Sequence, residues 1–403
     1  MTSPGDSSQL DRLMRRAEHV VRAEELADKL ASGKPMRVKL GLDPTARHVT
    51  LGWAVPLRKL REFQNEGHTV VLIIGDFTAR IGDPTGKNET RPQLTKEDVA
   101  ANAEACVAQL MDILIPENLE VRYNSEWLEP MDLGDLLALT AKYTVAQMLE
   151  RDDFSKRFKD HRPISLIEFM YPLLQGYDSV AVEADVELGG TDQLFNLLVG
   201  RDLQRAYGQP PQVALTMPLL EGLDGVQKMS QSLGNYVGIR EAPEEMFGKL
   251  MSIPDALVPR YAFLATDLDD PSIAELKASV DGGGPAAGDA KRSVARAIIA
   301  IYHGASAAAE AEAAFDRQFR QGAVPVDIPE HPVPTVAVAG GILSLPGAMV
   351  TLGLAASKGE ARRLIKGGGV KLDGTTLETE EVGADGLSGK VLQVGKRRFV
   401  RFR

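Results

Sequence analysis

A lysine flanked by small residues, Lys228, lies in a loop rich in glycine and serine at residues 222–234. Such a lysine can close over a triphosphate and neutralise its charge. Three earlier blocks, residues 41–45, 82–87 and 189–193, are small-residue turns that each carry one carboxylate and follow an apolar run. Carboxylates bind amines and hydroxyls, whereas lysines bind phosphates. The four blocks together therefore predict a site that binds an amino acid and ATP.

Three polar residues share one face of a predicted helix, namely Tyr171, Gln175 and Asp178. Residues at i, i+4 and i+7 lie on the same side of a helix. A face with a phenol, an amide and a carboxylate is too polar for an ordinary core, so it either faces solvent or lines a ligand pocket. The neighbouring turn blocks favour the pocket.

The elements that would position these residues alternate along the first half of the chain. Short apolar runs and longer helical stretches follow one another at residues 37–40, 53–66, 69–74, 97–114 and 119–123. Such alternation is typical of a parallel α/β sheet. Ligands bind such sheets at the carboxyl ends of the strands, where the turns at Asp43 and Asp83 fall.

The second half of the chain has a different pattern. Residues 242–321 are helical with one glycine break at residues 282–284, and four prolines follow within residues 325–334. Prolines make a connection stiff and extended, so this stretch predicts a domain boundary. Beyond it, residues 357–366 predict a short basic helix, and residues 391–402 alternate like strands.

Composition limits the classes of protein to consider. The chain has 403 residues, a net charge of −10, and apolar and charged fractions of 44% and 25%, which are typical of a soluble globular protein. No apolar run approaches the roughly 20 residues that span a membrane, and residues 1–16 are too polar for a secretory signal. A single cysteine, Cys106, excludes an internal disulfide and a Cys-rich metal site. We expect a cytoplasmic protein without a membrane partner or a metal site of its own.

Positive charge is concentrated at the end of the chain. Residues 349–403 hold 11 Lys or Arg and 6 Asp or Glu, a balance of +5, and the remainder holds 35 and 50, a balance of −15. This distribution is typical of a protein that binds RNA at one end, although uneven surface charge without a ligand gives the same count. The candidate RNA-phosphate contacts are Lys358, Arg362, Arg363, Lys366 and Lys371.

The order and spacing of these blocks resemble a bacterial tyrosyl-tRNA synthetase, which is a class I aminoacyl-tRNA synthetase. Residues 171–178 followed by residues 189–193 are the most specific part, and the similarity covers nearly the whole chain from about residue 30. The resemblance implies a homodimer that activates L-tyrosine with Mg²⁺-bound ATP and releases pyrophosphate. By the same resemblance, the enzyme would then transfer tyrosine to the 3′ end of tRNA(Tyr).

The resemblance also implies an α/β fold built from several parts. A Rossmann-like parallel-sheet catalytic domain, with a dimer-forming insertion around residues 120–185, precedes an α-helical anticodon-binding domain. A proline-rich linker then leads to a small α+β S4-like RNA-binding domain. The expected bounds of the four parts are residues 1–235, 236–325, 326–341 and 342–403.

Roles in tyrosine binding follow from the resemblance. Asp178 is expected to accept a hydrogen bond from the phenolic hydroxyl, and Gln193 to lie at the carboxylate end. The residues implied around the α-amino group are Asp43, Asp83, Tyr171 and Gln175. Phenylalanine would leave the buried Asp178 carboxylate unpaired, which explains selectivity for tyrosine.

Roles in ATP binding are implied in the same way. Asp192 is expected near the ribose hydroxyls, and Thr50, Gly52 and Gly190 beside the nucleotide. The residues that map onto the phosphate side are Thr45, Lys87, Arg91, Lys228 and Ser232. No covalent enzyme intermediate is needed, so catalysis would consist of positioning and of cationic stabilisation of the departing pyrophosphate.

The chain departs from the family pattern at several positions. Class I enzymes usually carry His-x-Gly-His where this chain has residues 50–53, Thr-Leu-Gly-Trp, and the second loop lysine is Gln231 here. Lys39 occupies a position near the tyrosine ring that is often tyrosine. One lost transition-state donor costs about 2.7–4 kcal/mol in comparable sites. Because the amino-acid pocket is complete, we nevertheless expect an active enzyme.

Three alternative functions stay open at this point. A synthetase-derived RNA-binding protein without ligase activity is favoured by the missing histidines and Gln231, and opposed by the complete pocket. A ligase for tryptophan is opposed by Asp178, whose carboxylate suits a phenol. A nucleotidyltransferase acting on a small molecule is opposed by the helical region and the basic end of the chain.

Overall fold

The computed structural model describes residues 8–45, 47–81, 95–319, 328–395 and 398–403. Contacts between residues divide the chain into two compact units, Met1–Ala309 and Glu310–Arg403. The finer domain bounds expected from the sequence stay a prediction. Among the described residues, no helix is both long and apolar enough to cross a membrane.

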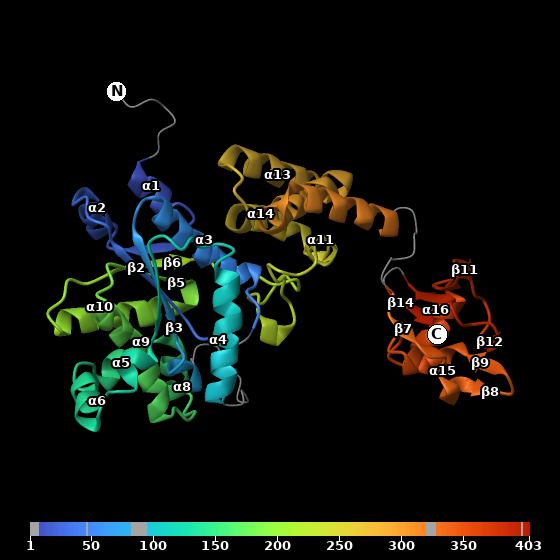
Figure 1. The fold of residues 1–403 in the computed structure, drawn as a ribbon, viewed down its shortest axis with the longest axis horizontal. Helices are drawn as coiled ribbons and strands as arrows, with labels where there is room; N and C mark the ends of the chain where they lie inside the picture. Colours follow the sequence, from blue (N-terminus) through green and yellow to red (C-terminus); the bar gives the residue numbers. More distant parts are fainter. Residues whose placement is uncertain (1–7, 46, 82–94, 320–327, 396–397) are drawn as a thin grey trace. The chain divides into compact units, whose positions relative to one another are not determined.

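A six-stranded sheet forms the centre of the first unit (Figure 1), in the order β1-β6-β5-β2-β3-β4. The strands are β1 (His19–Val21), β2 (Arg37–Leu42), β3 (Thr69–Ile74), β4 (Leu119–Tyr123), β5 (Val186–Gly190) and β6 (Val213–Met217). Only the β1–β6 pair of this sheet is antiparallel. The α/β class is confirmed, and β3 and β4 have the predicted bounds.

Helices connect and cover these strands, and polar residues begin several of them. The helices of this unit are α1 (Gln9–Met14), α2 (Ala23–Ala31), α3 (Leu51–Asn65), α4 (Lys96–Leu110), α5 (Ser125–Leu128), α6 (Leu133–Thr140), α7 (Val145–Met148), α8 (Asp152–Lys159), α9 (Leu166–Ala181), α10 (Leu194–Ala206), α11 (Pro243–Ser252), α12 (Val258–Ala265) and α13 (Asp270–Gly282). Helix α3 packs on β2, β3 and β5, whereas α10 packs on β5 and β6. A further helix, α14 (Gly284–Phe319), is interrupted at Gly304, whose φ of 86° lies in the left-handed region.

Two glycines allow α9 and α10 to approach each other closely. A Cβ atom on Gly176 of α9 would lie 3.2 Å from the backbone nitrogen of Gly200 in α10. It would also lie 2.9 Å from Cδ1 of Leu203. The close contact between the two helices therefore requires glycine at both positions. Because α10 also packs on β5 and β6, this contact positions α9 relative to the sheet.

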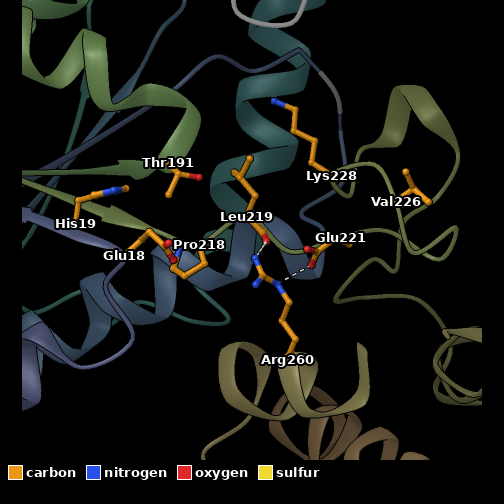
Figure 2. Close-up of a pocket in the computed structure, with 9 residues that line it drawn as sticks. All are labelled: Glu18, His19, Thr191, Pro218, Leu219, Glu221, Val226, Lys228 and Arg260. Carbon is orange, nitrogen blue, oxygen red and sulfur yellow. Dashed lines mark hydrogen bonds and ion pairs between the residues drawn. The ribbon is translucent and has the colours of Figure 1, made fainter. Parts of the chain in front are cut away.

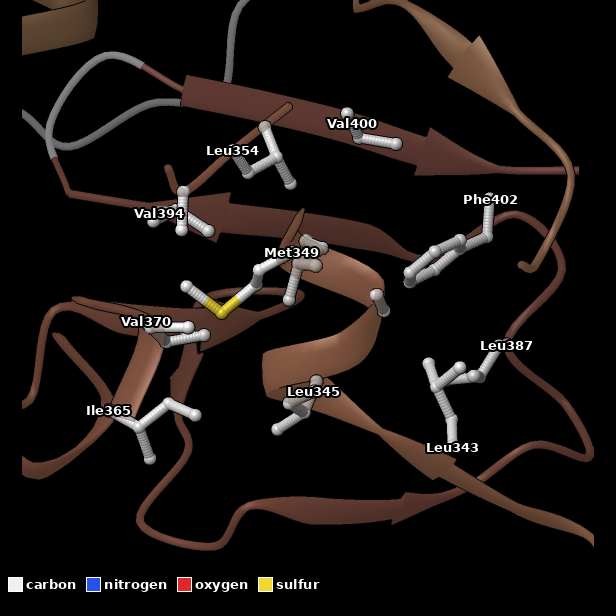
Figure 3. Close-up of a cluster of buried hydrophobic side chains, with 14 residues drawn as sticks. Leu343, Leu345, Met349, Leu354, Ile365, Val370, Leu387, Val394, Val400 and Phe402 are labelled. Carbon is white, nitrogen blue, oxygen red and sulfur yellow. The ribbon is translucent and has the colours of Figure 1, made fainter. Parts of the chain in front are cut away.

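The second unit has a small core of its own, drawn in Figure 3. A five-stranded sheet has the order β11-β10-β13-β14-β7, and a three-stranded sheet the order β12-β9-β8. The elements are β7 (Glu330–His331), β8 (Val338–Ala339), β9 (Ile342–Ser344), α15 (Leu345–Thr351), α16 (Lys358–Lys366), β10 (Val370–Leu372), β11 (Thr375–Thr376), β12 (Glu381–Gly383), β13 (Val391–Val394) and β14 (Arg398–Phe402). Met349, Ile365 and Phe402 are among the side chains that fill the core. The predicted basic helix is confirmed as α16.

Candidate active site

The candidate site lies where parallel strands end. Asp43 directly follows β2, Gly75 follows β3, and Gly190 is the last residue of β5. Because the carboxyl ends of parallel strands meet at one edge of a sheet, these turns lie at the same edge, where the turn at Asp43 was predicted. The predicted face of Tyr171, Gln175 and Asp178 lies on the single helix α9, which reaches the same region through contacts with Asp43 and Asn124.

Asp43 accepts hydrogen bonds from two different elements. The Tyr171 hydroxyl donates to Oδ2 over 3.0 Å, and the Thr78 hydroxyl donates to Oδ1 over 2.8 Å. Gly75 is required here because a Cβ atom at that position would overlap with Oδ1 of Asp43. The structure thus brings together Asp43 and Tyr171, two of the residues expected around an amino group.

Asp178 is buried and accepts hydrogen bonds from residues that follow β4. Trp127 Nε1 donates to Oδ1 over 2.8 Å, and Asn124 Nδ2 donates to Oδ2 over 3.4 Å. Asn124 Nδ2 also lies 3.0 Å from the Thr78 hydroxyl, which joins Asp178 to the Asp43 cluster. The sequence analysis missed Asn124 and Trp127, although their position just after the predicted strand at residues 119–123 was a signal.

Burial raises the pKa of Asp178 to about 7. The positive charge of Lys39 and the hydrogen bonds from Trp127 and Asn124 oppose this shift, whereas the negative charge of Glu187 adds to it. The carboxyl group therefore changes its charge near neutral pH, so a ligand that donates a hydrogen bond to it gains most when it is ionised.

Asn196 of α10 links two of the expected tyrosine-binding residues. Its Nδ2 donates to Gln175 Oε1 over 3.0 Å and to Gln193 Oε1 over 2.9 Å. Asn196 is buried, and its own Oδ1 accepts no hydrogen bond from the described residues. Asn196 was not predicted as a site residue from the sequence. Its position three residues after Gln193, one helical turn along the chain, was a signal that the two side chains are neighbours.

The Lys39 side chain is not exposed to the site. It is fully buried and makes an ion pair with Glu187, with 2.9 Å between Nζ and Oε1. The pair lies behind α9, because Nζ also donates to the backbone oxygen of Gln175 over 3.0 Å.

On the nucleotide side, Lys228 makes an ion pair with Asp192, with 2.7 Å between Nζ and Oδ2. Asp192 lies in the short 3₁₀ helix Thr191–Gln193, directly after β5. Gly190 permits this turn, since a Cβ atom there would lie 2.7 Å from Oδ1 of Asp192 and 2.8 Å from Cδ2 of Leu219. The expected ribose and phosphate residues therefore contact each other directly.

The Lys228 loop packs on the start of α3. The backbone N–H of Gly52 donates to Sδ of Met229 over 3.3 Å, and a Cβ atom on Gly52 would lie 3.3 Å from Cβ of Met229. Gln231 Nε2 donates to the backbone oxygen of His48. Within the loop, the Ser232 hydroxyl lies 2.9 Å from that of Ser230. The uncharged Gln231 thus links the loop to the segment just before α3.

Of the other residues predicted to bind the substrates, Thr50 and Thr45 make local hydrogen bonds, and three lie outside the described residues. Thr50 is the buried N-cap of α3, and its hydroxyl accepts from the backbone N–H of Trp53 over 3.3 Å. The backbone N–H of Thr45 donates to the backbone oxygen of Asp43 over 2.7 Å. Asp83, Lys87 and Arg91 lie outside the described residues.

A cavity of about 380 Å³ adjoins Lys228 (Figure 2). Its lining residues are Glu18, His19, Thr191, Pro218, Leu219, Glu221, Val226, Lys228 and Arg260. Arg260 donates to the Leu219 backbone oxygen over 2.7 Å and makes an ion pair with Glu221, with 2.6 Å between Nε and Oε2. A volume of this size is within the range of small-molecule sites.

The predicted RNA contacts lie in the second unit. Lys358, Arg362, Arg363 and Lys366 are exposed on α16, whereas Ala361 and Ile365 of the same helix are buried. Lys371 is half-buried on β10. The basic residues of α16 are therefore presented to solvent on the side of the helix that does not contribute to the core.

Comparison with known proteins identifies the family. Residues 31–320 match the family described as tRNA synthetases class I (W and Y), and residues 347–380 match the S4 domain. The chain therefore belongs to the class I tRNA synthetases of the tryptophan and tyrosine type, as the sequence predicted. A tyrosine–tRNA ligase of Moorella thermoacetica is 52% identical over 397 residues, which are 98% of this chain and 95% of the relative. One of Thermotoga maritima is 50% identical over 389 residues, 96% of each chain.

The chain also resembles solved structures in its fold. The chain resembles a C-terminally truncated mitochondrial tyrosyl-tRNA synthetase of Aspergillus nidulans with a TM-score of 0.63 at 22% identity, covering 79% of this chain and 95% of that one. A tyrosyl-tRNA synthetase of Archaeoglobus fulgidus complexed with L-tyrosine gives 0.60 at 24% identity, covering 75% and 98%. At these identities the likeness establishes the fold alone.

The raised pKa of Asp178 predicts how stability depends on pH. The folded protein holds the Asp178 proton up to about pH 7, whereas the unfolded chain releases it near 3.8. The resulting stabilisation is full below pH 3.8 and is lost as the pH rises through 7, a difference on the order of 4 kcal/mol. Asp178→Asn should therefore become more stable than the wild type as the pH rises from 5 to 8, measured by urea unfolding. The exposed Asp160→Asn is the control, and a pH-independent difference for Asp178→Asn would contradict the assignment.

Proposed function

We propose that this protein is a tyrosine–tRNA ligase, which activates L-tyrosine with ATP and transfers it to tRNA(Tyr) in the cytoplasm. The observation that carries the proposal is the buried Asp178 carboxylate on the same helix face as Gln175 and Tyr171. A phenolic hydroxyl would add a third hydrogen bond to this carboxylate, beside those from Trp127 and Asn124, so the expectation that Asp178 is unpaired without the substrate hydroxyl does not hold. The curated relatives, which match nearly the whole chain at about half identity, support the same reaction.

The α-amino group of tyrosine would meet hydrogen-bond acceptors. The Tyr171 hydroxyl donates its proton to Asp43, and a phenolic oxygen can accept a hydrogen bond as well as donate one. Gln175 Oε1 accepts from Asn196 Nδ2, which also donates to Gln193, the residue expected at the carboxylate end. An ammonium group with three N–H donors suits this set, and Asp83 is expected to add a carboxylate. Charge and geometry thus orient the substrate carboxylate towards the nucleotide.

ATP, bound as its Mg²⁺ complex, would change the partners of Asp192 and Lys228. Asp192 would accept from the ribose hydroxyls, and Lys228 would move to the phosphates together with Lys87 and Arg91. The cavity beside Lys228 provides room for part of the nucleotide. Thr50 and Gln231 hold the backbone but carry no charge, so Lys228 takes a larger share of pyrophosphate stabilisation than in relatives with the usual histidines.

Tyrosine-dependent ATP–pyrophosphate exchange tests the proposed activation step. The wild type should catalyse exchange with tyrosine faster than with tryptophan or phenylalanine. Lys228→Ala should lower kcat by about 10²–10³-fold, because one cationic donor to the transition state is lost. The exposed Lys156→Ala should have no effect.

Each contrary result points to one alternative function. Absence of exchange in the wild type, combined with tRNA binding, would support an RNA-binding protein without ligase activity. Faster exchange with tryptophan than with tyrosine would support a ligase for tryptophan. Exchange that depends on an unrelated small molecule in place of tyrosine would favour the nucleotidyltransferase.

A second copy of the chain would cover an apolar surface in the expected dimer-forming insertion. Six apolar side chains there are at least half exposed: Leu133, Leu137, Val145, Phe158, Leu166 and Ile167. A cavity of about 400 Å³ lies among the same helices, with Val145, Phe158 and Phe169 in its lining. Exposed apolar residues gathered in one segment are typical of a protein–protein interface, and closed homodimers are the commonest assembly.

A charge placed on this surface should separate the dimer. The double variant Phe158→Asp/Leu166→Asp should elute as a monomer in size-exclusion chromatography with light scattering, because two carboxylates cannot be buried unpaired in the interface. Circular dichroism should show an unchanged fold. Val336→Asp changes an equally exposed apolar residue of the second unit and should leave the dimer intact. A monomeric wild type at micromolar concentration would contradict the proposal.

The exposed basic face of α16 would bind the phosphates of tRNA. Reversing its charge with Arg362→Glu/Arg363→Glu/Lys366→Glu should raise the KM for tRNA at least tenfold, because three phosphate contacts are replaced by repulsion. Pyrophosphate exchange should stay unchanged, since that step does not use tRNA. Deleting residues 342–403 should give the same pattern, with Lys34→Glu as an exposed control. Equal losses in both reactions would refute this role.

A further inference from the structure

We propose that the buried Lys39–Glu187 ion pair fixes the orientation of the Gln175 amide and so makes the amino-acid site selective for an ammonium group. Lys39 and Glu187 are positioning residues in this inference, because they act on the ligand through Gln175. The inference rests on the proposed function, since it takes the α-amino group of tyrosine to be what Gln175 binds.

The sheet register creates the ion pair. Lys39 of β2 and Glu187 of β5 are direct neighbours in the parallel β2–β5 pair, and both side chains are fully buried. Lys39 Nζ has three acceptors: Glu187 Oε1 at 2.9 Å, Ser179 Oγ at 2.8 Å and the Gln175 backbone oxygen at 3.0 Å. An ammonium group has three N–H donors, so its hydrogen-bonding capacity is used completely.

The Glu187 carboxylate is surrounded by donors. Its Oε1 also accepts from Gln175 Nε2 over 3.3 Å, and its Oε2 accepts from the Ser179 hydroxyl over 3.0 Å and from Gln212 Nε2. Gly200 makes room for this arrangement, because a Cβ atom there would lie 2.6 Å from Gln212 Nε2 and 3.2 Å from Glu187 Oε2. The network is therefore part of the packing between α9, α10 and the sheet.

Glu187 determines which end of the Gln175 amide faces the ligand. An ionised carboxylate only accepts hydrogen bonds, so the NH₂ end of Gln175 must face it. The reversed amide would place two oxygens against each other in a buried place, which costs an unmade hydrogen bond as well as repulsion. Gln175 Oε1 consequently points to the other side, where it accepts from Asn196.

The result is a site lined by acceptors. Gln175 Oε1 and Gln193 Oε1 converge on Asn196, and the buried Oδ1 of Asn196 accepts no hydrogen bond from any residue that the structure describes. A ligand ammonium, with three N–H donors, can donate to such acceptors, whereas a carboxylate cannot. Lys39 keeps this arrangement in place by balancing the charge of Glu187, because a buried carboxylate without a counter-charge is strongly destabilising.

The double variant Lys39→Met/Glu187→Gln tests the inference. It removes both charges and keeps the volume and the polar contacts of residue 187 with Ser179 and Gln212. Replacing both members of a buried pair is far milder than removing one. The Gln175 amide is then free to turn, because a glutamine at position 187 can meet either end of it. Lys39→Met/Glu187→Leu is the second variant, and circular dichroism checks that each variant folds.

Calorimetric binding of three ligands separates positioning from a general structural effect. L-Tyrosine and tyramine carry the ammonium group, and 3-(4-hydroxyphenyl)propionate lacks it. The variants should lose on the order of tenfold in affinity for the first two ligands and little for the third. The control Lys29→Met/Asp185→Asn removes a less buried ion pair and should leave the preference unchanged.

Two outcomes would overturn the inference while the proposed function stands. Equal loss for all three ligands would mean that the ion pair only supports the fold, and an unchanged preference would mean that Gln175 is oriented by other contacts. Failure of the wild type to bind tyrosine would instead refute the proposed function, and this inference with it.

Discussion

Burial of one carboxylate, Asp178, is the constraint on which the amino-acid site depends. An acid removed from water tends to stay protonated, yet selectivity for a phenol needs an ionised acceptor. Trp127 and Asn124 supply hydrogen bonds that favour the ionised form, and Lys39 supplies a positive charge. These contributions only partly oppose the effect of burial, so the pKa of Asp178 stays raised, at about 7. Ionising the buried carboxyl group therefore still costs free energy, which a hydrogen bond from the hydroxyl of the proposed substrate would offset.

The amino-acid half and the nucleotide half of the proposed site differ in the contacts that their residues make with one another. In the amino-acid half, Tyr171 donates to Asp43, and Asn196 donates to Gln175. In the nucleotide half, Lys228 and Asp192 satisfy each other. In the proposed site, tyrosine would meet side chains that already contact one another, whereas ATP would have to replace the existing ion pair of Lys228 with Asp192. The neutral residues in place of the usual histidines increase the importance of that exchange.

Local signals in the sequence were sufficient for the elements and for part of the site. The apolar run at residues 69–74 became β3 with the same bounds, and the spacing from Tyr171 to Asp178 defined a true helix face. Contacts between distant elements were not accessible in this way. Lys39 and Glu187 meet only because β2 and β5 pair in one register, and Asn124 reaches Asp178 only because β4 ends beside α9.

The glycine contact between α9 and α10 has a consequence for altering the substrate range. Gly176 and Gly200 leave no spare room between these helices, and the charged network lies directly beside them. A bulkier amino acid therefore cannot be accommodated by spreading the helices apart. Space would instead have to come from residues outside this contact, such as the half-buried Trp127 of α5, whose indole donates to Asp178.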